Sequence, residues 1–293
     1  MESFIQHVHE LGLQVNGVIV TQNGRRLLEH AFVPDKRQRI YSCTKTFLGT
    51  ACGVALDQGL FSLHDQAVNY FADEWALTSA DRRQWEQVTI ERLLTMSIAD
   101  FPFSCKSEKN WLNAILDLPL PEISRKQLNY SNVPTYLLSI ILERASGRKT
   151  WEFMAEHVFT PLDIEPVADG ANCPEGYFIG GYGIAATLRE LDRLGHLYGN
   201  DGVYQGRRIV SEEWTREAMK PHGMKPEGNG GYGYLMWSVP GVGAMIAGML
   251  GQICLICRDK NAVITILSDL PDRSGQEDIL YKLLWDDLYA NLS

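Results

Sequence analysis

Residues 41–45 read Tyr41-Ser42-Cys43-Thr44-Lys45 and open a predicted helix that runs to about Gly59. A serine followed three residues later by a lysine places both side chains on one helical face, one turn apart. Ser42 would lie where the helix begins, beside unpaired backbone N–H groups and the positive end of the helix dipole. Burial disfavours the charged form of a lysine, so a buried, neutral Lys45 could take the proton of Ser42. The pair therefore indicates an activated nucleophile.

A second group of polar residues, Tyr130-Ser131-Asn132, comes just before a predicted helix over 133–143. A tyrosine hydroxyl can carry protons to and from a serine, particularly beside a lysine that favours its phenolate. Asn132 offers a donor and an acceptor to a substrate carbonyl or to the lysine. Taken alone, the tripeptide is also typical of a turn with a helix cap, and Ser-x-x-Lys of an ordinary helix with a solvated lysine. The presence of both patterns in one chain favours a catalytic site over these two ordinary structures.

A third stretch, Ala247-Gly-Met249-Leu-Gly251-Gln252, leads into a predicted strand over 252–257. Small residues at the start of a strand let a ligand approach the backbone closely. A free N–H group there could form an oxyanion hole with the N–H of Ser42. By itself the stretch is more typical of a glycine-rich turn before an edge strand.

The composition is that of an ordinary globular protein. The 293 residues are 45% hydrophobic and 22% charged, and they can bury a substantial core. The formal net charge of −9 argues against nucleic acid as a main partner. The N-terminal residues resemble no signal peptide, no segment is typical of a membrane span, and the six cysteines form no disulfide framework. We therefore predict a cytoplasmic protein that neither binds nucleic acid nor enters a membrane. The sequence does not predict its oligomeric state.

The order of the predicted elements indicates an α/β (α+β) fold with one sheet built from both chain ends. Helical spacing of apolar residues predicts a first helix near residues 4–11, and Asn23-Gly24 predicts a β-hairpin. Helices are next predicted at 90–96, 109–116, 133–143 and 151–158, the last stopped by Pro161. Thr187 and Glu190 form a capping box before another helix, and a further helix is predicted at 211–219. Glycines 228, 230, 231 and 233 predict a loop, followed by strands at 234–239, 252–257 and 262–268 and a last helix at 277–292.

These elements divide the chain into two predicted units. Residues 1–60 and 180–293 would form an α/β domain, and residues 61–179 a mainly helical lobe inserted into it.

Other motifs carry less weight. Gly181-Tyr-Gly-Ile-Ala-Ala186 fits a loose dinucleotide-binding pattern, but it lacks the acidic residue expected after a second strand. Cys254 and Cys257 lie three residues apart on a predicted strand, so their side chains face opposite sides of the sheet. We therefore expect this pair to form neither a zinc site nor a local disulfide. His7 and His9 point to different sides of their helix, so we expect no shared metal ion.

Together these residues resemble the serine β-lactamase and penicillin-binding-protein superfamily, especially its class C-like and esterase branch. The resemblance covers nearly the whole chain in six ordered matches. They are Ile40-Tyr-Ser-Cys-Thr-Lys-Thr-Phe, Gln58-Gly-Leu-Phe-Ser-Leu-His-Asp, Leu93-Leu-Thr-Met-Ser, Asn129-Tyr-Ser-Asn, Phe159-Thr-Pro-Leu-Asp-Ile, and Gly230-Gly-Tyr-Gly-Tyr leading to Gly248-x-x-Gly251-Gln252.

The resemblance implies an antiparallel sheet flanked by helices, an all-helical lobe, and an active site in the cleft between them. It implies acyl transfer on Ser42, with Lys45 and Tyr130 moving the proton. Asn132, Met249, Gly251 and Gln252 would bind the substrate, and the backbone N–H groups of Ser42 and Gln252 would form the oxyanion hole. It implies neither a metal ion nor an organic cofactor.

One departure from the family pattern bears on the substrate. The third motif of the family, Lys-Thr-Gly or His-x-Gly, aligns with Met249-Leu250-Gly251, which has no charge or hydroxyl to hold a substrate carboxylate. Losing such a contact costs about 1.5–3 kcal/mol, roughly ten- to a hundredfold in rate. We therefore predict an esterase or amidase on small uncharged substrates with weak or no β-lactamase activity. The alternative is a penicillin-binding-like module that binds or senses a ligand without turnover. Ile98-Ala99, in place of Ser-Gly, would change only the shape of the lobe.

Overall fold

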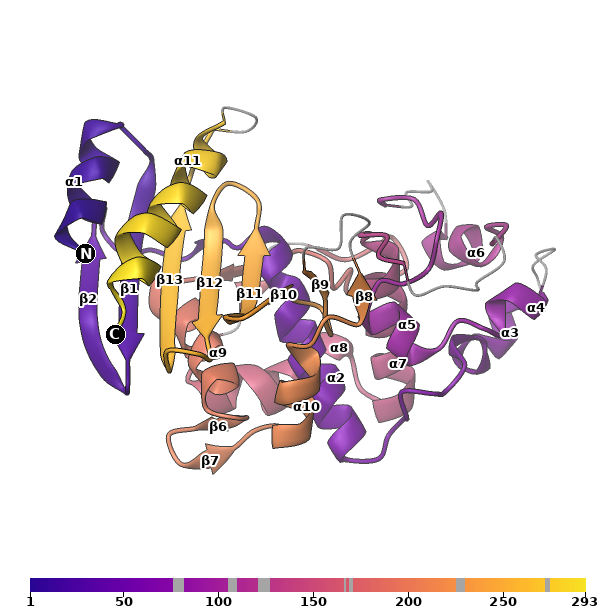
Figure 1. The fold of residues 1–293 in the computed structure, drawn as a ribbon. Helices are drawn as coiled ribbons and strands as arrows, with labels where there is room; N and C mark the ends of the chain where they lie inside the picture. Colours follow the sequence, from indigo (N-terminus) through magenta and orange to yellow (C-terminus); the bar gives the residue numbers. More distant parts are fainter. Residues whose placement is uncertain are drawn as a thin grey trace.

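An antiparallel sheet of eight strands, drawn from both ends of the chain, organises the fold (Figure 1). The computed structural model describes residues 1–75, 82–104, 110–120, 127–165, 167–168, 171–224, 230–271 and 275–293. Across the sheet, the strands are β2 (Arg25–Ala31), β1 (Val15–Gln22), β13 (Ala262–Ser268), β12 (Gln252–Cys257), β11 (Gly243–Gly248), β10 (Trp237–Val239), β9 (Gly231–Tyr232) and β8 (Gly223–Met224).

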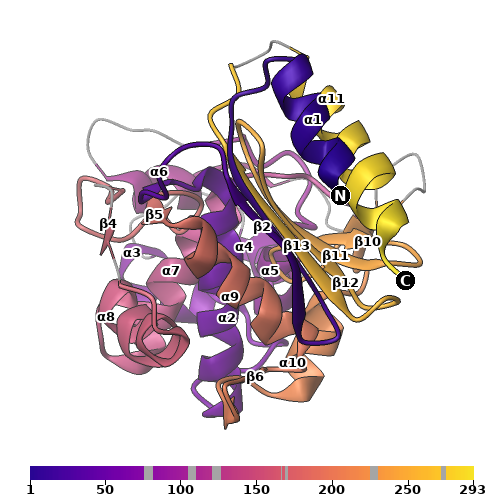
Figure 2. The same cartoon turned by 90° about the vertical axis from the view of Figure 1, so that its left-hand side faces the viewer.

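Helices cover both faces of this sheet (Figure 2). On one face lie α1 (Glu2–Glu10) and α11 (Gln276–Leu283), the latter continued by further helical turns to Asn291. The other face carries α9 (Leu188–Gly199) and, behind it, α2 (Thr44–Asp57). The remaining helices are α3 (Ala72–Trp75), α4 (Arg82–Trp85), α5 (Ile90–Leu94), α6 (Trp111–Leu116), α7 (Val133–Ser146), α8 (Thr150–Met154) and α10 (Glu212–Ala218). No described helix is both long enough and apolar enough to cross a membrane.

Two short strand groups complete the secondary structure. One is β3 (Gln38–Arg39), β5 (Ile184–Ala186) and β4 (Val167–Ala168), and the other pairs β6 (Val203–Tyr204) with β7 (Arg207–Arg208). The first group connects the segment before Ser42 with the segment around residue 184. The helices α3 to α8 come from between residues 72 and 154, and the strands of the main sheet come from either side. The proposed domain boundaries at residues 60 and 180 stay a prediction.

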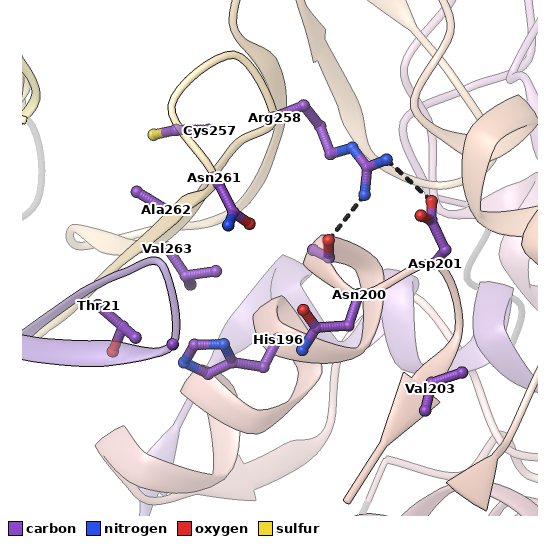
Figure 3. A pocket seen from close by; sticks show the side chains of 12 residues that line it. Thr21, His196, Asn200, Asp201, Val203, Cys257, Arg258, Asn261, Ala262 and Val263 are labelled. Atoms are coloured by element: carbon purple, nitrogen blue, oxygen red, sulfur yellow. Dashed lines mark hydrogen bonds and ion pairs between the residues drawn. The ribbon is translucent and has the colours of Figure 1, made fainter. Parts of the chain in front are cut away.

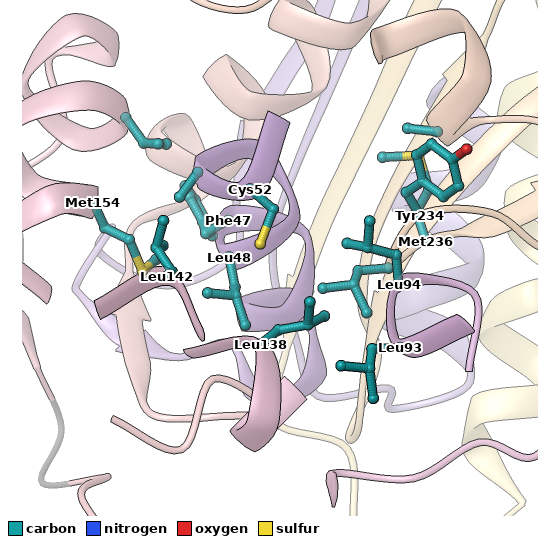
Figure 4. Packing of buried hydrophobic residues seen from close by; sticks show 14 of the residues in the cluster. Phe47, Leu48, Cys52, Leu93, Leu94, Leu138, Leu142, Met154, Tyr234 and Met236 are labelled. Carbon is teal, nitrogen blue, oxygen red and sulfur yellow. The ribbon is translucent and has the colours of Figure 1, made fainter. Parts of the chain in front are cut away.

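Helix α2 lies at the centre of the larger hydrophobic core. Every residue from Thr44 to Ala55 is buried, so the helix is enclosed on all sides. Figure 4 shows Leu48 of this helix beside Leu138 of α7, with Phe47 in the same cluster. At Gly53 an added Cβ would lie 2.5 Å from the Trp214 indole, so only glycine fits this contact. This packing fixes the start of α2, where Ser42 and Lys45 lie.

Several local predictions are confirmed. Asn23 and Gly24 have φ values of 52° and 72°, as a type I′ turn between β1 and β2 requires. The side chains of Thr187 and Glu190 both bond to backbone N–H groups and make the predicted capping box of α9. Strands β12 and β13 have the predicted bounds.

Other predictions differ from the structure. The strand predicted over 234–239 covers only 237–239, because Leu235 has a φ of 57° that a strand does not accommodate. Gly231 and Tyr232, predicted as part of a loop, form β9; Gly228 lies outside the described residues. Pro161 does not stop the helical path, since it occupies the first turn of a 3-10 segment over Thr160–Leu162. The helix predicted at 109–116 is α6, and Lys109 lies outside the described residues.

Candidate active site

Ser42 lies at the mouth of α2, as predicted, but inside a short 3-10 turn formed by Tyr41–Cys43. The residue before it, Tyr41, has a φ of 47°, a left-handed conformation that costs energy for a residue with a bulky side chain. Ser42 is half-buried and lines a cavity. The sharp turn therefore holds the serine at the cavity wall, where the first N–H groups of a helix have no intrahelical partner.

Lys45 lies one turn further on and is 1% exposed. Its Nζ is 3.1 Å from Ser42 Oγ, 2.7 Å from Asn132 Oδ1 and 2.7 Å from the Gly181 carbonyl oxygen. Burial lowers the pKa of the Lys45 amine from 10.5 to about 7. A large fraction of Lys45 is therefore neutral at neutral pH.

The contacts of Lys45 fit a neutral amine. Such an amine has two N–H donors and one lone pair, and the two 2.7 Å contacts are with carbonyl oxygens that only accept. The longer contact, with Ser42, is the one in which the partner is a hydroxyl that can donate. In its neutral form Lys45 can therefore use its lone pair to accept the proton of Ser42 across this contact.

Tyr130 lies next to both Ser42 and Lys45. Its ring lies 5.0 Å from Lys45 Nζ, stacks on Trp237 with centroids 5.3 Å apart, and meets Tyr232 edge-on at 5.7 Å. Burial raises the pKa of Tyr130 to about 12, although the Ser42 hydroxyl lowers it. We expected the lysine to favour a phenolate, but burial raises the pKa of Tyr130 instead. The phenol is protonated at neutral pH.

Asn132 is the residue before the first turn of α7 and is 8% exposed. Its backbone N–H donates to the Phe103 carbonyl at 2.8 Å. Its neighbour Ser131 is buried, donates to the Pro102 carbonyl at 2.6 Å and accepts from the Val133 N–H at 3.0 Å. These bonds fix the loop before α7, so the Asn132 side chain reaches both Lys45 and the cavity.

Gly181 belongs to the site although the sequence did not predict it. Its carbonyl accepts from Lys45, and an added Cβ would lie 2.5 Å from Asn132 Oδ1 and 2.9 Å from Thr135 Oγ1. The residue was part of the rejected dinucleotide pattern. The adjacent glycines 180 and 181 were the available signal, because glycine permits the close approach of a backbone to another group.

The three residues after Gly248 that we expected to bind the substrate, Met249, Gly251 and Gln252, have different environments in the structure. Met249 is 52% exposed and lines the cavity beside Ser42. Gln252 is fully buried, and its Nε2 donates to the carbonyls of Ser268 at 2.6 Å and Met249 at 3.2 Å. Gly251 has a φ of 81° and faces Ser268 and Leu280. We expected Gly251 and Gln252 at the substrate, but they shape the turn between β11 and β12 behind it.

The turn itself lies against the nucleophile segment. An added Cβ at Gly248 would lie 2.4 Å from the Ile40 carbonyl oxygen, two residues before Ser42. Met249 follows directly, so its backbone lies next to the start of the nucleophile turn. The strand β11 that ends at Gly248 was not predicted.

The cavity in front of Ser42 has a volume of about 560 Å³, which is in the range of small-molecule sites. Its polar wall includes Ser42, Ser104, Asn132 and Asn172. Arg39 also lines it and already has an interaction partner. Most of the remaining wall is aromatic or aliphatic and consists of Phe103, Trp111, Ile179, Tyr182 and Met249.

Comparison with known proteins agrees with this geometry. The family model Beta-lactamase matches residues 2–285. The chain is 22% identical over 280 residues to 6-aminohexanoate-dimer hydrolase from Paenarthrobacter ureafaciens, covering 82% of this chain and 68% of that protein.

Solved structures show the same fold. The octameric penicillin-binding protein homologue from Pyrococcus abyssi has a TM-score of 0.73 at 18% identity, over 97% of this chain and 76% of that one. The D-stereospecific amidohydrolase from a Streptomyces species has a TM-score of 0.71 at 16% identity, over 92% and 94% of the two chains.

The chain therefore belongs to the Beta-lactamase family. The predicted fold class, an antiparallel sheet flanked by helices, is confirmed. The prediction that the chain is a serine hydrolase with small-molecule substrates is confirmed as a class of enzyme.

Proposed function

We propose that the chain is an esterase or amidase that cleaves small neutral substrates through an acyl-enzyme on Ser42. The observation that carries this proposal is the buried amine of Lys45, held 3.1 Å from Ser42 Oγ by two further acceptors. A nucleophile with a neutral base in hydrogen-bond reach, and the base positioned by other groups, is the arrangement that covalent catalysis requires. The cytoplasmic location stays a prediction.

In the acylation step, Ser42 Oγ attacks the substrate carbonyl carbon and its proton passes to Lys45 Nζ. The resulting ammonium donates to Asn132 and Gly181 and retains one N–H for the proton's onward transfer. Tyr130, protonated and next to the serine, passes a proton to the leaving alcohol or amine and recovers one from Lys45. Water then attacks the acyl-enzyme, releases the acid and restores Ser42.

For the oxyanion hole we propose the backbone N–H groups of Ser42 and Met249. The N–H of Ser42 lies in the first turn of a helical segment, where a donor is available. From the sequence we assigned the second N–H group to Gln252. We assign it to Met249 instead, because Met249 lines the cavity and Gln252 is buried behind the turn.

The apolar wall supports neutral substrates. Phe103, Trp111 and Tyr182 offer aromatic surface to an acyl or leaving group, and Met249 stands where a charged anchor for a carboxylate would be expected. Among the relatives, one is a D-stereospecific amidohydrolase, which supports the inclusion of amides.

The test is labelling with a fluorophosphonate probe, read by intact mass, beside the hydrolysis of p-nitrophenyl butyrate. Wild type, Ser42→Ala and Ser104→Ala would be compared, because Ser104 lines the same cavity. We expect one adduct and turnover in wild type and Ser104→Ala, and neither in Ser42→Ala. Labelling without turnover would instead support the non-turnover binding module. Folded wild type that neither labels nor hydrolyses would refute the proposal.

A further inference from the structure

The carbonyl groups of the turn between β11 and β12 (residues 249–251) face two side chains that lie behind the turn. Gln252 Nε2 donates to the carbonyls of Met249 and Leu250, each at 3.2 Å. The Ser268 hydroxyl lies 2.6 Å from the Leu250 carbonyl oxygen and 2.8 Å from that of Gly251. Both side chains are fully buried. They therefore keep the carbonyl groups of the turn directed into the protein.

The turn needs this support, because its backbone is unfavourable. Leu250 has a φ of 62°, a left-handed conformation that residues with side chains rarely adopt. Residues in such conformations persist only where the surrounding structure fixes them. The contacts with Gln252 and Ser268 provide that structure, so they also fix the backbone of Met249 at the cavity.

Gln252 contacts the nucleophile segment as well, both before and after Ser42 in the chain. Gln38, four residues before the serine, donates from Nε2 to Gln252 Oε1 at 3.2 Å. Cys43, the next residue after the serine, has its Sγ 3.8 Å from the Gln252 carbonyl oxygen. One buried residue thus connects the turn that contains Met249 with the segment that contains Ser42.

Gln38 is itself held by further polar contacts. Its Oε1 accepts from Asn16 Nδ2 at 2.6 Å, and its Nε2 also donates to the Ser268 carbonyl at 3.1 Å. Gln252 Oε1 has a second donor, the Ser268 backbone N–H, at 3.4 Å. Every polar atom of the two glutamine side chains therefore has a partner. A buried polar network that is fully satisfied in this way is rigid.

We propose that Gln252 and Gln38 are positioning residues for the oxyanion hole, and that their contact sets the separation of its two N–H groups. This inference rests on the proposed function, which assigns those groups to Ser42 and Met249. Oxyanion-hole donors act when they are aimed at the place that the negative charge takes in the transition state. A link between their two segments therefore acts on the transition state more than on the bound substrate.

The test is the hydrolysis of p-nitrophenyl butyrate by Gln252→Leu and Gln38→Leu, with n-butylboronic acid as a tetrahedral transition-state analogue. A misplacement of about 1 Å at a reacting group can cost roughly a hundredfold in rate. We expect kcat/KM to fall by up to about a hundredfold in Gln252→Leu, and by about tenfold in Gln38→Leu, which keeps the bonds of the turn. The inhibition constant of the boronic acid should rise by the same factors.

The pH profile separates this effect from one on the base. Lys45 and its contacts are unchanged in both variants, so the midpoint of the rise in kcat/KM with pH should equal that of wild type. A shifted midpoint would assign the loss of activity to Lys45 and overturn the inference.

The matched control is Gln22→Leu. Gln22 is 6% exposed, and its Nε2 also donates to two carbonyls, those of Lys260 at 3.0 Å and Ser293 at 2.8 Å. It lies at the opposite end of the sheet from the turn, next to Thr21 of the cavity shown in Figure 3. We expect this variant to lose stability but to keep the kcat/KM and the boronic acid inhibition of wild type.

A double variant tests whether the two glutamines act through each other. Gln38→Leu should then cost no further activity in the Gln252→Leu background, whereas independent effects would multiply. Multiplied losses, or a folded Gln38→Leu protein within twofold of wild type in kcat/KM and in boronic acid inhibition, would overturn the inference and leave the proposed function intact. Gln38 is only half-buried, so its variant decides the matter should Gln252→Leu not fold. A wild type without Ser42-dependent hydrolysis would overturn both.

Discussion

Gly181→Ala tests whether the position of Asn132 sets the activity of Lys45. The backbone of Gly181 is not left-handed, so alanine is allowed there and the effect is one of space. The new Cβ would lie 2.5 Å from Asn132 Oδ1, whereas ordinary contacts begin at 3.4 Å, a difference of 0.9 Å. Asn132 must move by about that distance, and it accepts from Lys45 at only 2.7 Å.

A misplacement of about 1 Å at a reacting group can cost roughly a hundredfold in rate. We therefore expect kcat/KM for p-nitrophenyl butyrate to fall about a hundredfold in Gly181→Ala. Overpacking should also lower the free energy of unfolding by about 1–3 kcal/mol, measured in urea. The matched control is Gly199→Ala, whose Cβ would make an ordinary contact at 3.5 Å with Val263. A folded Gly181→Ala protein with kcat/KM within twofold of wild type would refute the reasoning.

Three more predictions follow from the same structure. Only neutral Lys45 can accept a proton, and burial lowers the pKa of its amine to about 7. The value of kcat/KM for a neutral ester should therefore rise tenfold per pH unit below pH 7 and level off above it. A flat profile from pH 5 to 9 would contradict the assignment of Lys45 as the base. Met249→Lys should raise acylation by carboxylate-bearing β-lactams relative to neutral esters by roughly ten- to a hundredfold, and an unchanged ratio of the two rates would remove the argument. Leu138→Ala should lower the free energy of unfolding by about 2–5 kcal/mol, because Leu138 is fully buried; a urea midpoint equal to wild type would disagree.

Local chemistry made much of the fold predictable from the sequence. The Asn23-Gly24 turn and the Thr187 capping box depend on residues a few positions apart, and both form as predicted. Strand β11 was missed because its sequence, Gly243 to Gly248, is rich in glycine and alanine and resembles a turn. It is a strand because it pairs with β12 in a hairpin and with β10 on its other edge, a context that its own residue types do not indicate.

The candidate site shows the same division. Ser42 and Lys45 share one helical turn, so their contact follows from spacing alone. Asn132 reaches them from 87 residues away, and the motif patterns suggested it. Gly181 contributes a backbone carbonyl and room for Asn132, and the adjacent glycines 180 and 181 were its one local signal, because no side chain marks the position. The burial of Gln252 likewise depends on which face of the turn meets the core.

The pairing of β1 with β13 has a consequence for synthesis of the protein. Val15 pairs with Ser268, and β1 lies between β2 and β13 in the finished sheet. During translation at about 5–20 residues per second, this hairpin therefore waits roughly 10–50 s for its neighbour. Over that interval one edge of β1 has unpaired N–H and C=O groups, and Val18 and Val20 lack the part of their apolar cluster that comes from β13 and α11. The newly made N-terminal hairpin is thus a natural client for chaperones that bind extended apolar segments.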